Sequence, residues 1–276
     1  MSYFAPDSLT DALSHLAGEP GQIVAGGTDV YPARGRRPAA ERYLDVTRIA
    51  GFTEVSHGPE GSRFGAAVTW SDIVRADLPP VFDGLKAAAK EVGSIQIQNA
   101  GTLAGNICNA SPAADGVPAL MTLDAQVEIA SAARGVRRVP LEAFLTGVRR
   151  TALEADELVT AIWIPAQPDG MRGAFEKLGA RRYLVISICM TAAAVAVDAQ
   201  GRISDARIAV GACSAVAQRL RSLEQEVIGL SPDAVTVTET HLAPLSPIDD
   251  VRGAASYRLD AVGAQIVRAI RAAGTR

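Results

Sequence analysis

A run of fourteen small and polar residues, from Thr102 to Asp115, constrains this chain more than any other segment. It reads TLAGNICNASPAAD and carries no charge before its final residue. A buried strand would be richer in Val, Ile and aromatic residues, whereas a solvated loop would carry Lys and Glu. Small residues let a ligand approach the backbone closely, and hydroxyl, amide and carboxylate groups supply directed hydrogen bonds. The run is therefore typical of a wall of a binding site.

A second stretch of the same character, Val24 to Val30, reads VAGGTDV and follows a short predicted strand. Glycine-bearing turns after a strand bind anionic groups through backbone N–H groups, without a cationic side chain. The two stretches together predict two walls of one site for a large, polyhydroxylated, phosphate-bearing cofactor. The Gly26-Gly27 pair alone is weak evidence, because such pairs usually mark plain turns.

Two common nucleotide-binding motifs are missing from the sequence. No G-x-G-x-x-G follows a predicted strand and opens a helix, and no G-x-x-x-x-G-K-[ST] is present. Because these motifs define the Rossmann and P-loop phosphate sites, the phosphate-binding fold predicted here is a different one.

Composition limits the classes of protein to which the chain can belong. Its 276 residues favour about two domains, and 48% hydrophobic against 21% charged residues predicts a sizeable core. A net charge of −3 without a basic run argues against a nucleic-acid partner. The longest apolar run, 185–197, is too short for a membrane span, which needs about 20 residues. The N-terminus has no basic region followed by an apolar stretch, so we expect a cytoplasmic globular protein.

The cysteines and histidines argue against a metal site. Cys108, Cys189 and Cys213 are far apart and form no C-x-x-C pair, which is unlike a disulfide framework, a zinc site or an iron–sulfur site. We interpret the three cysteines as small buried residues. The three histidines are isolated in the sequence, so we expect no catalytic histidine and no metal ligand.

Apolar periodicity and turn residues predict the main elements. Ser8 to Asp11 resembles a capping box at the start of a helix, and a domain boundary is expected in 166–170, which is rich in turn formers. The predicted helices are 9–18, 80–92, 219–228 and 255–273, and the predicted strands are 22–25, 42–46, 63–68, 126–130, 158–164, 186–197 and 203–210.

Several segments, taken in order, resemble the FAD-binding (medium) subunit of molybdenum hydroxylases, the family of xanthine dehydrogenase and aerobic carbon monoxide dehydrogenase. Each segment is weak alone, but their order and spacing over nearly the whole chain make a chance match improbable. Besides the two small-residue stretches, the segments are QNAG at 98–101, DEL at 156–158, IWIP at 162–165, FEKL at 175–178, RR at 181–182, ARIAVG at 206–211 and AASYR at 254–258.

The resemblance implies an α+β fold. Residues 1–168 would form a two-lobed FAD-binding fold of the vanillyl-alcohol oxidase (PCMH) type, with lobes of approximately 1–55 and 56–168. A smaller α+β C-terminal domain would follow over residues 171–276. FAD would lie between the lobes without a covalent bond to the chain.

The resemblance also implies which residues contact FAD. Asp115 would be a carboxylate contact on the adenosine side and is expected to lie exposed in a loop. Val159 would be an apolar contact to the flavin, and Lys177 a basic residue near its ring. The first wall, along the pyrophosphate and ribityl chain, would be Val24, Ala25, Gly26, Gly27, Thr28, Asp29 and Val30; the opposing wall would be Thr102, Leu103, Ala104, Gly105 and Asn106, with Ser111 beyond it.

Structural interpretations compete with these roles. Asp29 alternatively caps the helix after the glycine turn, and Asn106 and Asn109 alternatively brace the loop backbone. Lys177 alternatively forms a solvated basic patch with Arg181 and Arg182.

The sequence allows two interpretations for each of three further residues. Ala104 stands where many relatives have a second Gly, and a positive φ there would cost roughly 1–2 kcal/mol; a tolerant backbone is the simpler interpretation. Phe175 and Tyr183 could stack near the flavin, but core packing is the favoured interpretation.

The implied function is that of an electron-transfer subunit. FAD on this chain would receive electrons from 2Fe–2S clusters on a small partner subunit, after substrate oxidation at a molybdenum cofactor on a large one. The acceptor would be NAD, a quinone or oxygen, and the assembly would be a dimer of heterotrimers. The alternatives are a self-contained flavin oxidase or dehydrogenase of the same superfold, and a scaffold subunit that has lost the flavin. The intact small-residue stretches argue against the scaffold.

Overall fold

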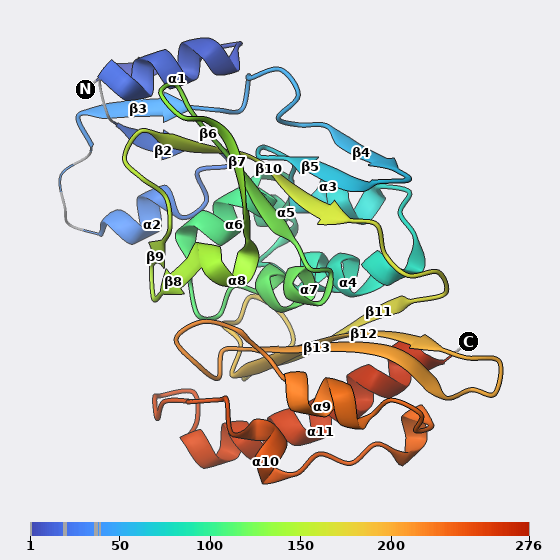
Figure 1. Cartoon of the computed structure of the whole chain (residues 1–276). Coiled ribbons are helices and arrows are strands. Elements are labelled where there is room, and N and C mark those ends of the chain that lie inside the picture. Colours follow the sequence, from blue (N-terminus) through green and yellow to red (C-terminus); the bar gives the residue numbers. More distant parts are fainter. Residues whose placement is uncertain (1, 19–20, 36–37, 39, 276) are drawn as a thin grey trace.

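The computed structural model describes residues 2–18, 21–35, 38 and 40–275 (Figure 1). The N-terminal segment forms a small parallel sheet with strand order β1-β3-β2. Helix α1 covers this region, and its buried Ala12 and Leu16 join the main core. The elements are β1 (Ser2–Phe4), α1 (Leu9–Gly18), β2 (Gln22–Val24), α2 (Val30–Arg34) and β3 (Arg42–Asp45).

A five-stranded antiparallel sheet follows, with strand order β4-β5-β10-β6-β7. Its central strand β10 is flanked by β5 and β6 and has a bulge between Val159 and Ala161. The strands are β4 (Val55–Gly58), β5 (Gly61–Gly65), β6 (Gln126–Ser131), β7 (Gly135–Pro140) and β10 (Glu157–Pro165).

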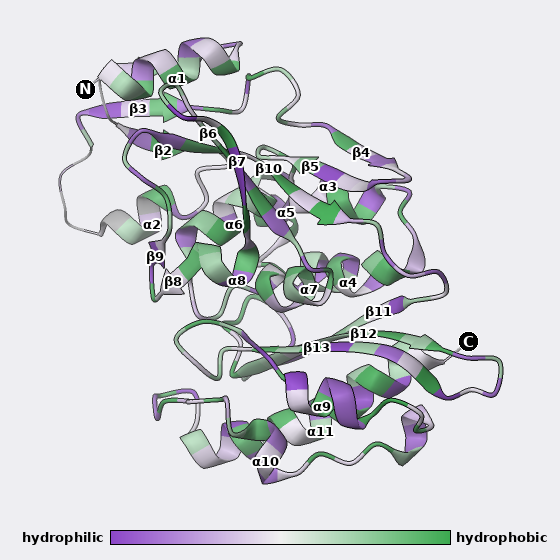
Figure 2. Cartoon of the chain, in the orientation of Figure 1, coloured by the Kyte–Doolittle hydropathy of each residue, from purple (hydrophilic) through white to green (hydrophobic). Residues whose placement is uncertain are grey.

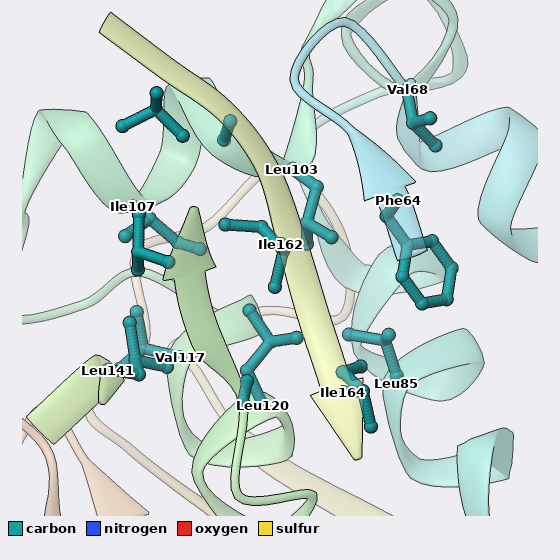
Figure 3. Close-up of a cluster of buried hydrophobic side chains, with 14 of the residues drawn as sticks. Phe64, Val68, Leu85, Leu103, Ile107, Val117, Leu120, Leu141, Ile162 and Ile164 are labelled. Carbon is teal, nitrogen blue, oxygen red and sulfur yellow. The ribbon is translucent and has the colours of Figure 1, made fainter. Parts of the chain in front are cut away.

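Short helices between these strands pack against the sheet and form the main core. Figure 3 shows Phe64 and Ile162 from the sheet beside Leu85, Leu103 and Leu120 from three helices. The connecting elements are α3 (Trp70–Arg75), η1 (Pro80–Phe82), α4 (Asp83–Glu91), α5 (Ile95–Ala100), α6 (Leu103–Asn109), α7 (Gly116–Thr122), α8 (Leu141–Phe144), β8 (Leu145–Gly147) and β9 (Arg150–Thr151).

The C-terminal segment is a second antiparallel sheet, β11-β12-β13-β14, that lies between two helical layers (Figure 1). Alternate residues of β12 serve both faces: Ala192 and Ala194 join the main core, while Ala193 and Val195 join a second core against α11. In Figure 2 the outer helix α9 is largely hydrophilic. The elements are β11 (Arg172–Leu178), β12 (Cys189–Val197), β13 (Ile203–Gly211), β14 (Gln218–Arg219), α9 (Arg221–Glu226), η2 (Pro232–Ala234), α10 (Glu239–Leu242) and α11 (Ala255–Gly274).

Strongly patterned elements agree with the sequence predictions. The Ser8 hydroxyl accepts a hydrogen bond from Asp11 N at 3.1 Å at the start of α1, and α11 covers the predicted C-terminal helix. The predicted strand 186–197 begins later, at Cys189. No helix is predicted from the sequence in the stretch from Thr102 to Asp115, but Leu103–Asn109 is helical with Thr102 as its N-cap.

Candidate functional site

A cavity of 570 Å³ opens between the N-terminal sheet and the helices beneath β10. Both small-residue stretches line it, together with the bulged part of β10. Eleven of the sixteen residues predicted to contact FAD line this cavity: Ala25, Gly26, Gly27, Thr28, Asp29, Val30, Thr102, Ala104, Gly105, Asn106 and Val159. The sequence therefore located two walls that the fold brings together.

The first wall turns sharply at the end of β2. A Cβ on Gly26 would lie 1.8 Å from the carbonyl oxygen of Ala100, so no larger residue fits there. Gly27 has a φ of +67°, in the left-handed region that favours glycine. The two glycines thus place the first wall directly against the segment that leads into the second.

The second wall is helix α6. The Thr102 hydroxyl accepts a hydrogen bond from Gly105 N at 3.0 Å, which caps the helix. Leu103 N donates to Val68 O at 3.0 Å, which anchors this end of α6 to the core. Ala104 has helical backbone angles, so Ala in place of Gly carries no strain of the kind considered from the sequence.

Asn106 supplies the feature that best fits a cofactor. Its Oδ1 is buried and, among the described residues, has no hydrogen-bond partner, although the residue lines the cavity. Buried polar atoms are nearly always satisfied by protein, water or a ligand. A ligand with hydroxyl or N–H donors, such as FAD, would satisfy this acceptor. Within the described part of the chain, Asn106 Oδ1 braces no backbone group.

Apolar side chains form the remainder of the lining. Val159 lies beside the bulge in β10, and Leu158 precedes it. Trp70, Ala66 and Leu153 also line the cavity, and sequence analysis did not single them out. The Trp70 side chain is buried against Gly116, where an added Cβ would lie 2.4 Å from the ring. A planar aromatic group bound here would be shielded from water on this side.

Asp29 stands at the N-cap position of α2 but makes no capping hydrogen bond with its side chain. Its Oδ2 accepts hydrogen bonds from Asn109 Nδ2 and, at 3.3 Å, from Arg149 Nη1. The capping interpretation is therefore wrong, and the carboxylate instead links the first wall to the end of α6. Arg149 was not found from the sequence because it lies 120 residues from Asp29.

Asp115 and Lys177 form a buried ion pair outside the cavity lining. Lys177 Nζ lies 2.8 Å from Asp115 Oδ2, and Ser187 Oγ donates to Asp115 Oδ1 at 2.7 Å. Burial raises the pKa of the Asp115 carboxyl, while Lys177 and Ser187 oppose that rise. The expectation of an exposed Asp115 is wrong, as is that of a solvated Lys177, whose side chain is 6% exposed.

The other predicted contacts lie behind the walls. Leu103 is fully buried in the core, and the Ser111 hydroxyl accepts a hydrogen bond from Ala113 N at 3.3 Å. Val24 is half-buried in β2 and does not line the cavity.

The cysteines and aromatic residues differ in part from expectation. Cys189 and Cys213 are buried as expected, but Cys108 is exposed and lines the cavity. Phe175 packs against the main core, whereas Tyr183 is 63% exposed with the Arg182 guanidinium 5.4 Å from its ring centroid. Among the described residues, no group of three or more His, Cys, Asp or Glu side chains could hold a metal ion.

Comparison with known families assigns the fold. The family described as "FAD binding domain in molybdopterin dehydrogenase" matches residues 1–167. This chain belongs to that family. The "CO dehydrogenase flavoprotein C-terminal domain" matches residues 174–273. The predicted α+β fold, with an FAD-binding domain followed by a C-terminal domain, is confirmed.

Relatives in this family match nearly end to end. The nicotine 6-hydroxylase medium subunit of Paenarthrobacter nicotinovorans is 34% identical, over 99% of this chain and 97% of that protein. The xanthine dehydrogenase FAD-binding subunit of Escherichia coli O157:H7 is 31% identical with the same coverage.

Solved structures show the same architecture. Carbon monoxide dehydrogenase from Hydrogenophaga pseudoflava, which in that structure lacks the Mo-pyranopterin moiety of its cofactor, matches with a TM-score of 0.87 and 26% identity, over 99% of this chain and 96% of that chain. Quinoline 2-oxidoreductase from Pseudomonas putida 86 matches with a TM-score of 0.85 and 28% identity, over 99% and 96%.

The chain is therefore an FAD-binding subunit of the molybdenum hydroxylase family and part of an oxidoreductase. The resemblance expected from the sequence is confirmed. Within the described part of the chain, every helix is too short or too polar to cross a membrane.

Proposed function

We propose that this chain is the electron-transfer subunit of a molybdenum hydroxylase complex. It would accept electrons from 2Fe–2S clusters on a small partner subunit and pass them to an external acceptor such as NAD, a quinone or oxygen. A large partner subunit would carry the molybdenum cofactor, within a dimer of heterotrimers in the cytoplasm. Residues 1–168 and 171–276 would be the two domains of the chain.

The cavity between the two small-residue walls carries this proposal. Its 570 Å³ is within the range of small-molecule sites, and Asn106 offers it an unsatisfied acceptor. Among the described residues that line the cavity, no acid side chain is paired with a base. This fits the role, because bound FAD supplies the redox chemistry while the protein supplies binding, orientation and electrostatics.

The residues of the cavity have separate roles in binding FAD. Gly26 and Gly27 allow the ligand to approach the backbone closely, and Asn106 accepts a hydrogen bond from it. Val159 and Trp70 exclude water from an apolar part of the cavity. Asp115 and Lys177 remain predicted FAD contacts, and their pairing favours a supporting role behind the walls.

The test begins with the flavin. Chain expressed alone and purified should contain about one FAD per chain, released into solution when the protein is precipitated with acid. It should contain neither iron nor acid-labile sulfide, because the 2Fe–2S clusters are assigned to a partner. Absence of flavin would favour the scaffold alternative, and flavin that remains with the precipitate would favour a covalent oxidase.

The electron-transfer role needs a second measurement. Material purified from the native source should contain molybdenum and iron together with this chain. When the cluster-bearing partner is reduced chemically and mixed with the flavin-loaded chain, the visible absorbance of the flavin should bleach, because the cofactor carries the redox chemistry. A free monomer whose flavin no partner can reduce would favour the self-contained oxidase.

A further inference from the structure

The charge of the cavity poses a problem for the proposed cofactor. Among the described residues that line it, Asp29 is the one with a charged side chain. That carboxylate is half-exposed and belongs to the first wall. A cofactor with a diphosphate carries the same sign of charge, so an uncompensated Asp29 would weaken its binding.

Arg149 supplies the compensating charge from behind the wall. Its Nη1 lies 3.3 Å from Asp29 Oδ2 and 3.2 Å from the Asn109 carbonyl oxygen, and it also donates to Asn109 Oδ1. Asn109 Nδ2 in turn donates to Asp29 Oδ2. The three side chains therefore form a closed ring of hydrogen bonds, which we call the Arg149 clasp. Arg149 itself does not line the cavity.

The backbone fixes the clasp in place. Arg149 lies between β8 and β9, and its N–H donates to the Ala110 carbonyl oxygen at 2.8 Å. Both residues have positive φ, 56° at Arg149 and 47° at Ala110. Such angles are uncommon outside glycine and persist where the surrounding structure holds them. The loop between β8 and β9 thus places the Arg149 guanidinium between the first wall and the end of α6.

We propose that Arg149 is a positioning residue for cofactor binding. It neutralises Asp29 and ties that carboxylate to Asn109, which holds the two walls together and makes the cavity acceptable to a diphosphate anion. This inference rests on the proposed function, since it takes FAD as the ligand. Asp29 and Asn109 are the residues through which Arg149 acts.

The test is a double-mutant cycle on FAD affinity. Flavin is removed from wild type, Arg149→Met, Asp29→Asn and the double variant, and FAD is titrated back while flavin fluorescence is followed. Arg150→Met is the matched control, because it removes the same charge from the adjacent residue. Thermal melts of the flavin-free proteins report on folding separately.

Arg149→Met should weaken FAD binding about fivefold, which is near the upper end of what one partly exposed charge pair contributes. In the Asp29→Asn background, Arg149→Met should have little further effect. The FAD affinity of the double variant should therefore stay within about twofold of that of Asp29→Asn. The loss in Arg149→Met should shrink in 1 M NaCl, because salt screens the exposed Asp29 charge. Arg150→Met should bind FAD as wild type does.

Other outcomes overturn the proposal in distinct ways. Unchanged affinity in Arg149→Met refutes it, and an equal loss in the presence of Asp29→Asn shows that Arg149 does not act through that carboxylate. If Arg149→Met does not fold, Arg149→Lys replaces it in the cycle; retention of the charge should then preserve most of the affinity, and a full loss refutes the proposal. Failure of wild type to bind FAD refutes the proposed function itself.

Discussion

Lys177 Nζ on β11 lies 2.8 Å from the carboxylate of Asp115, the residue that precedes α7. This buried ion pair joins the C-terminal sheet to the helical layer of the FAD-binding segment. Ser187 completes the contact from the segment that leads into β12. The pair therefore couples three parts of the chain at a position behind the second wall.

Asp115→Ala should reduce the free energy of unfolding by about 3–5 kcal/mol, because it leaves Lys177 buried without its counter-charge. Asp115→Leu combined with Lys177→Met should recover most of this loss, since two apolar side chains can replace a buried ion pair. Urea unfolding of the flavin-free proteins measures both. A double variant as unstable as Asp115→Ala would show that packing, and not charge, determines the loss.

Glu157 should control stability in acid. Arg137 forms a two-point ion pair with it, at 2.8 and 2.7 Å, and lowers the pKa of the Glu157 carboxyl to about 2 from an ordinary 4.5. The folded pKa is the lower one, so the stabilisation is present above pH 4.5 and is lost as the pH falls from 4.5 towards 2.

Glu157→Gln should therefore cost about 1.5–3 kcal/mol at pH 7 and flatten the stability profile below pH 4.5. Urea unfolding at a series of pH values measures this. The exposed Glu60→Gln is the control and should leave the profile unchanged. If the free energy of unfolding of Glu157→Gln falls just as steeply below pH 4.5 as that of wild type, other carboxylates cause the acid sensitivity.

Replacing the two glycines of the first wall by alanine should lower the stability of the chain for two different reasons. Gly26→Ala collides with the backbone of Ala100 and should cost about 1–3 kcal/mol or more, with weaker FAD binding as the walls separate. Gly27→Ala has space for its methyl group but takes on a strained φ, at about 1–2 kcal/mol.

Gly18→Ala serves as the control for both, because nothing lies within 4 Å of the Cβ that this substitution adds. It should be neutral or slightly stabilising. Melting temperatures and flavin titrations together report the three effects. Equal behaviour of Gly26→Ala and Gly18→Ala would contradict the close approach of the first wall to Ala100.

Cys108 should report on occupancy of the cavity. Cys108 is exposed at the cavity, but the surrounding protein disfavours its thiolate and raises its pKa to about 12. N-ethylmaleimide should therefore label it slowly, at a rate that increases with pH because the thiolate is the reactive form. Cys189 and Cys213 are buried and should react only in denaturant.

Mass spectrometry should find one label on the flavin-free native chain, three labels on the unfolded chain, and none on the native chain with saturating FAD. Labelling of Cys108 at the same rate with and without FAD would place the ligand away from α6. A Cys108→Ser variant confirms which thiol reacts.

The sequence was sufficient for features whose signals are local. Residues 9–18 and 255–273 have helical periodicity and form α1 and α11. Both small-residue stretches stood out by composition, and both line the cavity. Helix α6 was missed because its small residues have no apolar periodicity, although Thr102 carried an N-cap signal.

Features that depend on contacts between distant residues were out of reach. Arg149 meets Asp29 only because β8 and β9 return to the end of α6. Burial of Asp115 and Lys177 depends on the C-terminal sheet packing against α7. No local sequence spacing predicts the contact of Arg149 with Asp29 or of Lys177 with Asp115. The sequence therefore identified the residue types but not their partners.

Asp29 precedes Arg149 by 120 positions in the sequence, which sets an order of events during synthesis. A chain grows from its N-terminus at about 5–20 residues per second, so the first wall emerges several seconds before the loop that completes the clasp. In that interval the second wall emerges as well, but the cavity still lacks Leu153, Leu158 and Val159, which follow Arg149 in the sequence. The complete cavity therefore forms late in synthesis, and we expect tight cofactor capture to follow that point.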